Sequence, residues 1–248
     1  MVADIPHPQI ELSGIYTAYM GAELPVIRDL SLNIGKGEFV MVGGPNGAGK
    51  TTLLETINGM LYITHGSARV CGLDVTKQGV EVRKRTGYVI QSFAFDPLTP
   101  FTVEHVVMMG RYGILGCFRN PSEPDYRAAE EAMRMLDLED LAEKPIGTLS
   151  GGQQQKVLIA QNLAKKPDIM LLDEPFSNLD LCTREFVSGV LEDISSQGCT
   201  VCMVSHAFDA LPDKDLRIVV MDEGCIRLNT ICHSSEVEDT IRRMTVVS

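Results

Sequence analysis

The sequence lacks any apolar run long enough to cross a membrane. Its longest uninterrupted apolar runs, such as residues 169–172 and 218–221, are four residues long, whereas a transmembrane helix needs about 20. The first residues, among them Asp4 and His7, contain neither the basic nor the apolar segment of a signal peptide. We therefore expect a cytoplasmic chain that contains no membrane span.

Positive charge is also scarce. Lys and Arg number 22 against 33 Asp and Glu, which gives a net charge of −11. A chain with this balance repels a nucleic-acid backbone on the whole rather than neutralising it. We therefore expect no nucleic-acid partner.

The seven cysteines show no repeated spacing of the kind that indicates a disulfide framework or a zinc site. Cys199 and Cys202 do form a C-x-x-C, but they lie in the apolar segment 200–204, which predicts a buried strand. Core packing is the simpler interpretation, and a redox or metal role is the alternative.

What the sequence does contain is an alternation of strand and helix patterns. The apolar runs 38–42, 169–172, 200–204 and 217–221 predict buried strands separated by helix-length segments, as in a parallel sheet. Helical spacing of apolar residues appears at 51–60 and 125–138. With 248 residues, 44% of them hydrophobic, and no internal repeat, the chain can form one α/β domain with a full core.

A glycine-rich segment between the first of these strands and the first helix matches G-x-x-x-x-G-K-[ST]. Its residues are Gly44, Pro45, Asn46, Gly47, Ala48, Gly49, Lys50, Thr51 and Thr52. Glycines allow backbone N–H groups to point at phosphate oxygens, and the following helix favours negative charge at its N-terminus. We expect Lys50 to reach the β- and γ-phosphates of a nucleotide and the Thr51 hydroxyl to bind Mg²⁺.

Two carboxylates end the predicted strand 169–172. Strand ends of this kind form nucleotide sites in α/β folds. We expect Asp173 to hold Mg²⁺ and Glu174 to act as the general base or to position the attacking water. The two segments together predict a P-loop NTPase.

The segment 149–153, Leu-Ser-Gly-Gly-Gln, selects one kind of P-loop NTPase. Because it is an unbroken LSGGQ signature, the chain resembles the ABC ATPases. In that family this turn binds the γ-phosphate of an ATP held by the other copy of a dimer, so the resemblance implies an ATP- and Mg²⁺-dependent homodimer around two ATP. The nucleotide-contacting residues that it implies here are Ser150, Gly151, Gly152 and Gln153.

The resemblance assigns further roles. Gln91 matches the Q-loop glutamine, which touches Mg²⁺ or the attacking water, and His206 matches the switch histidine at the γ-phosphate. Asp180, in the D-loop segment Ser-Asn-Leu-Asp at 177–180, is implied to cross the dimer interface. Tyr19 matches the aromatic that stacks on adenine, with Tyr16 as the alternative. One departure is Ala207, where the family usually has an aspartate.

The fold that this resemblance implies is a P-loop NTPase (RecA-like) core with a parallel-rich sheet, an N-terminal antiparallel β region and an inserted α-helical subdomain. We expect one ABC ATPase domain at 8–232, with the core at about 8–93 and 149–232 and the helical subdomain at about 94–148. Residues 233–248 are expected to be a short tail, too short for an added regulatory domain.

Within the helical region, residues 102–113 together with Phe118 and Arg119 are similar to ATPases of manganese, zinc and iron-chelate importers, although these residues could also serve packing alone. The resemblance implies import of a metal ion or chelate, driven from the cytoplasmic face of the membrane. It implies membrane permease subunits and an extracytoplasmic substrate-binding protein as partners. The alternative is a soluble ABC ATPase without a membrane partner. A GTPase is disfavoured because the Asn-Lys-x-Asp element is absent.

Overall fold

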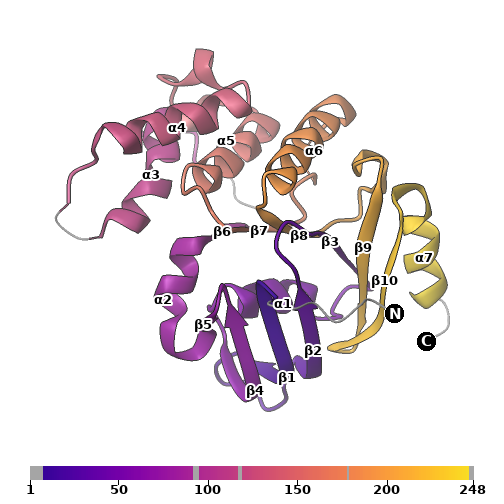
Figure 1. Ribbon diagram of the computed structural model, residues 1–248. Helices are drawn as coiled ribbons and strands as arrows, with labels where there is room; N and C mark the ends of the chain where they lie inside the picture. Colours follow the sequence, from indigo (N-terminus) through magenta and orange to yellow (C-terminus); the bar gives the residue numbers. More distant parts are fainter. Residues whose placement is uncertain (1–7, 92–94, 117–118, 178, 246–248) are drawn as a thin grey trace.

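The computed structural model describes residues 8–91, 95–116, 119–177 and 179–245. Phe118 of the importer-like segment and Asn178 of the D-loop segment lie outside these ranges. Figure 1 shows a large sheet at the centre, a smaller sheet below it and a group of helices at the upper left.

The central sheet has six strands in the order β10-β9-β3-β8-β7-β6. Neighbouring strands from β9 to β6 are parallel, and β10 is antiparallel to β9. The bounds are β3 Phe39–Gly43, β6 Thr86–Val89, β7 Ile169–Asp173, β8 Thr200–Val204, β9 Asp215–Asp222 and β10 Cys225–His233. All residues of β3, β7 and β8 are buried, as continuous apolar runs predict for strands covered on both faces.

The smaller sheet is antiparallel and has the order β2-β1-β4-β5. Its strands are β1 Ile10–Ala18, β2 Ile27–Ile34, β4 Tyr62–Val70 and β5 Leu73–Asp74. Helix α1 (Lys50–Ile57) contributes Leu53, Leu54 and Ile57 to a hydrophobic core shared by both sheets. The predicted α/β class with an N-terminal antiparallel region is confirmed.

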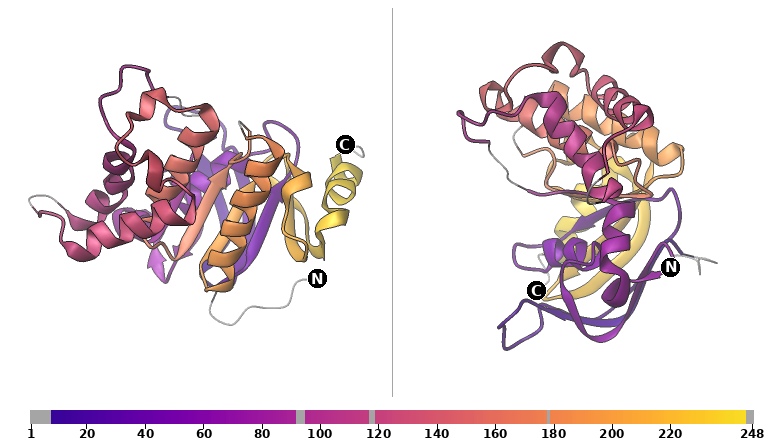
Figure 2. Two further views of the ribbon diagram at one scale, coloured as in Figure 1. Left: turned by 90° about the horizontal axis from the view of Figure 1, so that it is seen from above. Right: turned by 90° about the vertical axis from the view of Figure 1, so that its left-hand side faces the viewer.

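The inserted helical region consists of α3 (Val103–Leu115) and α4 (Glu123–Met135), which pack against α5 (Gly151–Leu163). In Figure 2, left, this group and α7 (Val237–Thr245) stand on opposite sides of the sheet. The remaining helices are α2 (Val75–Arg85) and α6 (Leu181–Ser196). Within the described ranges, every helix is too short or too polar to cross a bilayer.

The structure adds two details to the sequence predictions. The helix-length segment between β8 and β9 forms only the 3-10 turn Phe208–Ala210. Leu211, which precedes Pro212, is extended, because a residue before proline avoids the helical region.

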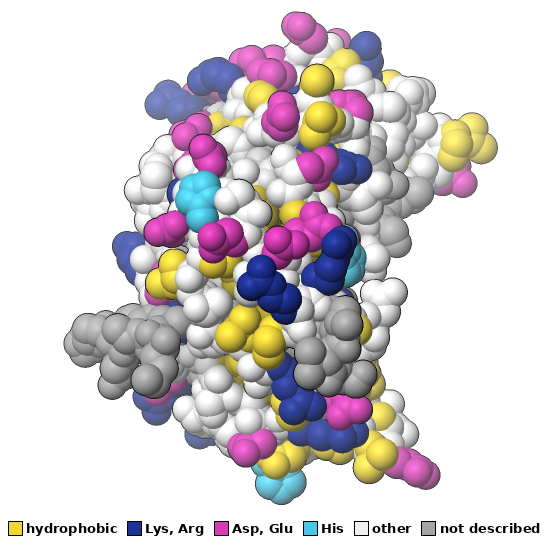
Figure 3. Space-filling model, turned by 90° about the vertical axis from the view of Figure 1, so that its right-hand side faces the viewer, with side chains coloured by type: hydrophobic (Ala, Val, Ile, Leu, Met, Phe, Trp, Pro, Cys, Tyr) yellow, Lys and Arg dark blue, Asp and Glu magenta, His cyan; other side chains and the backbone are white. Residues whose placement is uncertain are grey.

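The second detail is that residues 233–248, expected to be a tail, contain α7, which packs on β9 and β10. Val237 is fully buried there. On this face of the molecule, basic side chains lie next to acidic ones (Figure 3).

Candidate functional site

The phosphate loop runs from the end of β3 to the start of α1 and depends on glycine at defined positions. The φ angles of Gly44, Gly47 and Gly49 are 134°, 81° and 96°, values that side-chain-bearing residues rarely adopt. A Cβ atom at Gly44 would also collide with the carbonyl oxygen of Met221 in β9. Gly44 is therefore required for two separate reasons.

Distant segments hold this loop from behind. In the turn between β9 and β10, Gly224 N donates to Ala48 O (3.1 Å), and Gly224 O accepts from Arg28 N (3.0 Å). Ile241 of α7 packs directly on Gly43, where a Cβ atom would overlap its side chain. The loop is thus fixed by contacts from three other parts of the chain.

Lys50, the first residue of α1, turns back over the loop. Its Nζ donates to the carbonyl oxygens of Gly44 (2.8 Å) and Pro45 (2.9 Å). Burial lowers the pKa of the Lys50 ammonium, and the carboxylates of Glu174 and Asp173 oppose that shift. A cation placed in this way can meet the terminal phosphates of a nucleotide bound in the loop.

Thr51 and Asp173 meet across the cleft. The Thr51 hydroxyl donates to Asp173 Oδ2 at 2.7 Å. Burial raises the pKa of Asp173, and the Thr51 hydrogen bond and Lys50 oppose the shift. A hydroxyl and a carboxylate that converge on one point match the oxygen ligands of Mg²⁺, which uses one or two carboxylates together with substrate phosphates. The described residues include no group of three or more His, Cys, Asp or Glu suited to a metal.

Glu174 follows β7 with a positive φ of 51°. Its backbone N donates to Val204 O (2.8 Å), which ties the strained residue to β8. Its Oε2 accepts from His206 N at 3.3 Å, and its Oε1 lies 3.4 Å from His206 Nε2. Burial raises the pKa of Glu174, and His206 opposes the shift. Hydrogen bonding with His206 thus holds the Glu174 carboxylate in place, and its raised pKa favours uptake of a proton.

These groups line one cleft with a volume of about 660 Å³. It brings together residues that the sequence analysis drew from separate motifs, and it adds two apolar residues that no motif indicated, Val26 and Val204. The predicted residues that line it are Asn46, Gly47, Gly49, Lys50, Thr51, Thr52, Gln91, Asp173, Glu174 and His206. The arrangement can bind a triphosphate and direct a water at its end.

Of the two tyrosines proposed for adenine stacking, Tyr19 does not line this cleft but contacts a residue that does. Its hydroxyl donates to Glu55 Oε2 (2.8 Å) and lies 3.2 Å from the hydroxyl of Thr52, which lines the cleft. Tyr16 instead meets the ring of His65 edge to face, with the centroids 5.6 Å apart. It borders a different cavity.

The predicted signature and D-loop residues lie outside this cleft. Ser150 is the exposed N-cap of α5, and its Oγ accepts from Gln153 N (3.3 Å) while Gln153 Oε1 accepts from Ser150 N (3.0 Å). Asp180 caps α6 and accepts from the backbone and the hydroxyl of Thr183, hydrogen bonds that lower its pKa. Among the described residues, the side-chain hydrogen bonds of Ser150 and Asp180 go to Gln153 and Thr183 and not to the phosphate loop.

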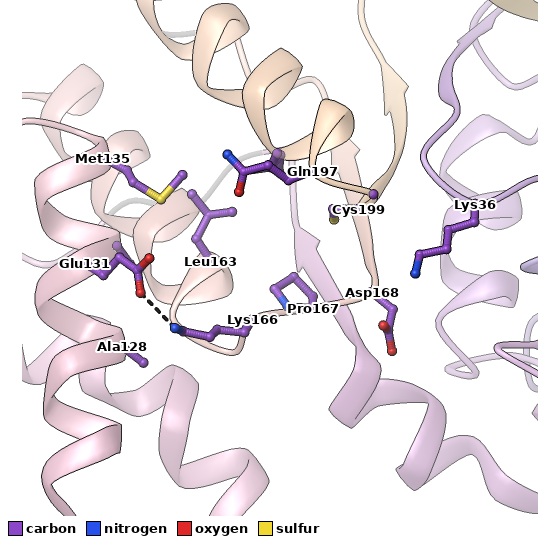
Figure 4. Close-up of a pocket in the computed structure, with 13 residues that line it drawn as sticks. Lys36, Ala128, Glu131, Met135, Leu163, Lys166, Pro167, Asp168, Gln197 and Cys199 are labelled. Atoms are coloured by element: carbon purple, nitrogen blue, oxygen red, sulfur yellow. Dashed lines mark hydrogen bonds and ion pairs between the residues drawn. The ribbon is translucent and has the colours of Figure 1, made fainter.

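A second cavity of about 330 Å³ opens at the other end of β7, between α4 and the C-terminal ends of α5 and α6. Figure 4 shows Lys166 pointing to Glu131, and their charged atoms are 2.8 Å apart. Cys199 also lines this cavity, which contains none of the predicted site residues.

Cys199 and Cys202 face different cores. Cys199 packs against the core on one face of the sheet, and Cys202 belongs to the core on the other. Burial raises the pKa of Cys199 to about 12 and also raises that of Cys202. Because only the thiolate is reactive, this supports core packing over the redox alternative.

Comparison with known proteins resolves the family. The pattern of the family described as ABC transporter matches residues 27–177, more than half of the chain. The chain belongs to the ABC transporter family. This span contains the phosphate loop, Gln91, the signature, and the two carboxylates after β7. The ATPase activity and the ATP-binding role predicted from the sequence are confirmed by this membership.

Two curated relatives in the ABC transporter family are similar to most of this chain. The chain is 36% identical over 204 residues to the manganese transport system ATP-binding protein MntB of Bacillus subtilis, a match that covers 82% of this chain and 79% of MntB. It is 35% identical over 230 residues to the high-affinity zinc uptake system ATP-binding protein ZnuC of the same organism, covering 89% and 96%.

Among solved structures, the chain resembles the dimeric ATP-binding cassette MJ0796 in a post-hydrolysis state bound to ADP and phosphate. The TM-score is 0.75 at 29% sequence identity, and the match covers 89% of this chain and 97% of that one. An ABC cassette of the same fold therefore binds the products of ATP hydrolysis as a dimer.

Two residues of the importer-like segment in α3, Gly110 and Arg111, hold this helix against its neighbours. A Cβ atom at Gly110 would collide with the carbonyl oxygen of Gln161 in α5. Arg111 Nη2 pairs with Asp125 Oδ1 (2.8 Å), and its Nη1 donates to Ala164 O (3.0 Å), so this side chain joins α3, α4 and the end of α5. Both residues serve packing.

Proposed function

We propose that the chain is the ATP-hydrolysing subunit of an importer for a metal ion or metal chelate, and that two copies close around two ATP molecules. The observation that carries this proposal is that the predicted nucleotide-binding residues fall into two separate places on the chain. The phosphate loop, Thr51–Asp173 and Glu174–His206 share one cleft, whereas the Ser150 turn is exposed elsewhere. The similarity to MntB and ZnuC, which are named for manganese and zinc transport systems, supports a metal as cargo.

ATP binding starts at the phosphate loop. The N–H groups of the loop and the N-terminus of α1 attract the phosphates, and Lys50 exchanges its carbonyl partners for phosphate oxygens. Thr51 and Asp173 would hold Mg²⁺ between them, and Gln91 at the cleft edge would contact the metal or the water. When bound, Mg²⁺ neutralises charge on the β- and γ-phosphate oxygens. Tyr19 would stack on the adenine.

Hydrolysis uses the Glu174–His206 pair. Glu174 orients a water and takes a proton from it as the water oxygen bonds to the γ-phosphorus and the bond to the bridging oxygen breaks. ADP and phosphate are the products. The pKa of Glu174, raised by burial, makes this carboxylate a stronger base than an exposed one. His206, which lies against both carboxylate oxygens, holds Glu174 in place and would contact the γ-phosphate.

The second copy completes the site. The α5 N-terminus, with Ser150 and Gly151 exposed, presents unpaired N–H groups and a hydroxyl that suit an anion. Gly152 and Gln153 continue this turn. We assign this turn to the γ-phosphate of the ATP held by the other copy, with Asp180 at the same interface.

Permease subunits are the proposed membrane partners, with an extracytoplasmic binding protein beyond them. This is supported by exposed hydrophobic side chains between Ile90 and Tyr112. They are Ile90, Leu98, Phe101, Met109 and Tyr112. Gathered into one patch, such side chains would suit an interface with another protein. The chain would thus act at the cytoplasmic face of the membrane, as one domain at 8–232 with the helical subdomain at 94–148.

The deciding experiment replaces Glu174 by Gln. ATP hydrolysis should fall by at least about a hundredfold because the general base is lost, while ATP still binds and the variant accumulates as an ATP-bound dimer in size-exclusion chromatography. Glu223→Gln is the matched control, because Glu223 also has a positive φ, 48°, but is exposed on the turn after β9. Turnover at the wild-type rate in Glu174→Gln would refute the role of Glu174.

Transport is tested separately from hydrolysis. The wild-type chain should co-purify with a multi-span permease and support uptake of labelled manganese or zinc by cells, and Glu174→Gln should abolish that uptake. A hydrolytically active chain that never associates with a membrane protein would favour the soluble ABC ATPase instead.

A further inference from the structure

The loop that carries Tyr19 has little packing of its own. Residues 19–26 join β1 to β2, and the side chains of Met20 and Leu24 are 105% and 69% exposed. Two backbone hydrogen bonds order the loop: Ala22 N donates to Tyr19 O at 3.0 Å, and Val26 N donates to Thr17 O at 2.8 Å. The Tyr19 ring, 42% exposed, therefore owes its orientation mainly to the contacts of its hydroxyl.

That hydroxyl is tied to α1. It donates to Glu55 Oε2 at 2.8 Å, and it lies 3.2 Å from the Thr52 hydroxyl. Thr52 and Glu55 are three residues apart and so lie on one face of the helix. Because α1 begins at Lys50, the same rigid helix carries the Tyr19 anchor and the phosphate site.

Within the part of the chain that the structure describes, the Glu55 carboxylate has no other hydrogen-bond partner. It is half-buried, and no Lys or Arg among the described residues forms an ion pair with it. A hydrogen bond to a carboxylate is shorter and stronger than one between neutral groups. The carboxylate of Glu55 is thus directed at the tyrosine.

We propose that Glu55 is a positioning residue that, through the Tyr19 hydroxyl, fixes the Tyr19 ring against α1, the helix that begins at the phosphate loop. This inference rests on the proposed function, in which Tyr19 stacks on the base. Burial raises the pKa of Tyr19, and Glu55 adds to the shift, so the hydroxyl remains protonated and able to donate. The exposed ring face stays free for stacking.

The test compares Glu55→Ala, Glu55→Gln and Tyr19→Phe in steady-state ATP hydrolysis. Tyr19→Phe keeps the ring and removes only the hydroxyl. Glu55→Ala and Tyr19→Phe should each raise the KM for ATP about three- to tenfold, the effect of losing one hydrogen bond of typical strength at a partly exposed site, with kcat changed by less than about twofold. Glu55→Gln should restore part of the affinity, because its amide oxygen still accepts. The double variant should be no weaker than either single variant.

Inorganic tripolyphosphate separates positioning from damage to α1, because it has the phosphates but no base. Its inhibition constant should be the same in Glu55→Ala and in the wild type. Glu130→Ala, which removes an exposed carboxylate from α4, is the control and should match the wild type in both assays. Thermal melts check that each variant is folded, and Glu55→Gln and Tyr19→Phe carry the test if Glu55→Ala is not.

Three outcomes would overturn the inference: an unchanged KM in Glu55→Ala, additive effects in the double variant, or equal weakening of ATP and tripolyphosphate. None of them touches the proposed function, which depends on hydrolysis by the wild type and its loss in Glu174→Gln.

Discussion

The phosphate loop and the signature turn are both glycine-containing turns at the start of a helix, yet they are held in different ways. The phosphate loop is fixed by distant segments, through Gly224 at Ala48 and Ile241 at Gly43. The Ser150 turn is instead held locally, by a reciprocal pair of hydrogen bonds between Ser150 and Gln153.

This difference indicates that the phosphate loop is complete within one chain and that the Ser150 turn is not. Lys50 is 8% exposed and enclosed by its own chain, whereas Ser150 is exposed. A helix N-terminus turned to solvent attracts an anion but cannot enclose it. The signature turn therefore gains a function only when something covers it, and a second phosphate loop carrying ATP would do so.

Mixing two inactive variants tests this difference most strongly. Lys50→Ala should lose ATP binding, and Ser150→Ala should lose hydrolysis by about a hundredfold or more, as for removal of one donor to transition-state charge. In a symmetric dimer, an equal mixture recovers up to about a quarter of the wild-type rate, because each mixed dimer has one intact site. The measurement is ATPase activity before and after mixing. No recovery would place both residues in one chain's site.

Two glycines of the phosphate loop test how strongly distant segments hold it. Gly44→Ala should destabilise the fold by about 3 kcal/mol, from backbone strain together with the clash against β9. Gly47→Ala is the matched control, because Gly47 also has a positive φ but has no atom within 4 Å of its Cβ position. It should cost only about 1 kcal/mol. Denaturant unfolding measures both, and equal values would mean that β9 does not brace the loop.

The smallest expected effect is on the melting temperature, through the ionisation of the buried Glu174 carboxylate. Because the pKa of Glu174 is raised in the folded state, the folded protein holds this proton to a higher pH than the unfolded chain does. Ionisation of Glu174 therefore destabilises the fold as the pH rises through the folded pKa. Glu174→Gln should raise the melting temperature at pH 7.5 by about 2 °C, and less at pH 5. A larger gain at pH 5 would contradict the burial shift.

Much of the site could be predicted because its residues are adjacent in sequence. Thr51 follows Lys50 and Glu174 follows Asp173, so a correct strand and helix prediction places each pair. The strand 200–204 was predicted with the bounds that β8 has. Parallel pairing then brings the strand ends to one edge of the sheet, where the cleft opens.

The rest depends on side-chain contacts between distant residues. The hydrogen bond from Tyr19 to Glu55 and the packing of Ile241 on Gly43 follow no periodicity. The segment between β8 and β9 is long enough for an α-helix but forms only a 3-10 turn. Pro212 is the sequence signal that argues against an α-helix there. Gly110 and Arg111, taken as marks of a transporter subgroup, hold α3 against α5, a role that only the packing of the helices reveals.

The two carbonyl contacts of Lys50 also give the loop a means of discrimination. Any anion that enters must replace both hydrogen bonds before it gains anything from the ammonium. A lone phosphate or a carboxylate has few oxygens to offer in exchange, whereas a triphosphate chain reaches the loop and the lysine together. Small anions should therefore compete only weakly with ATP for the phosphate loop.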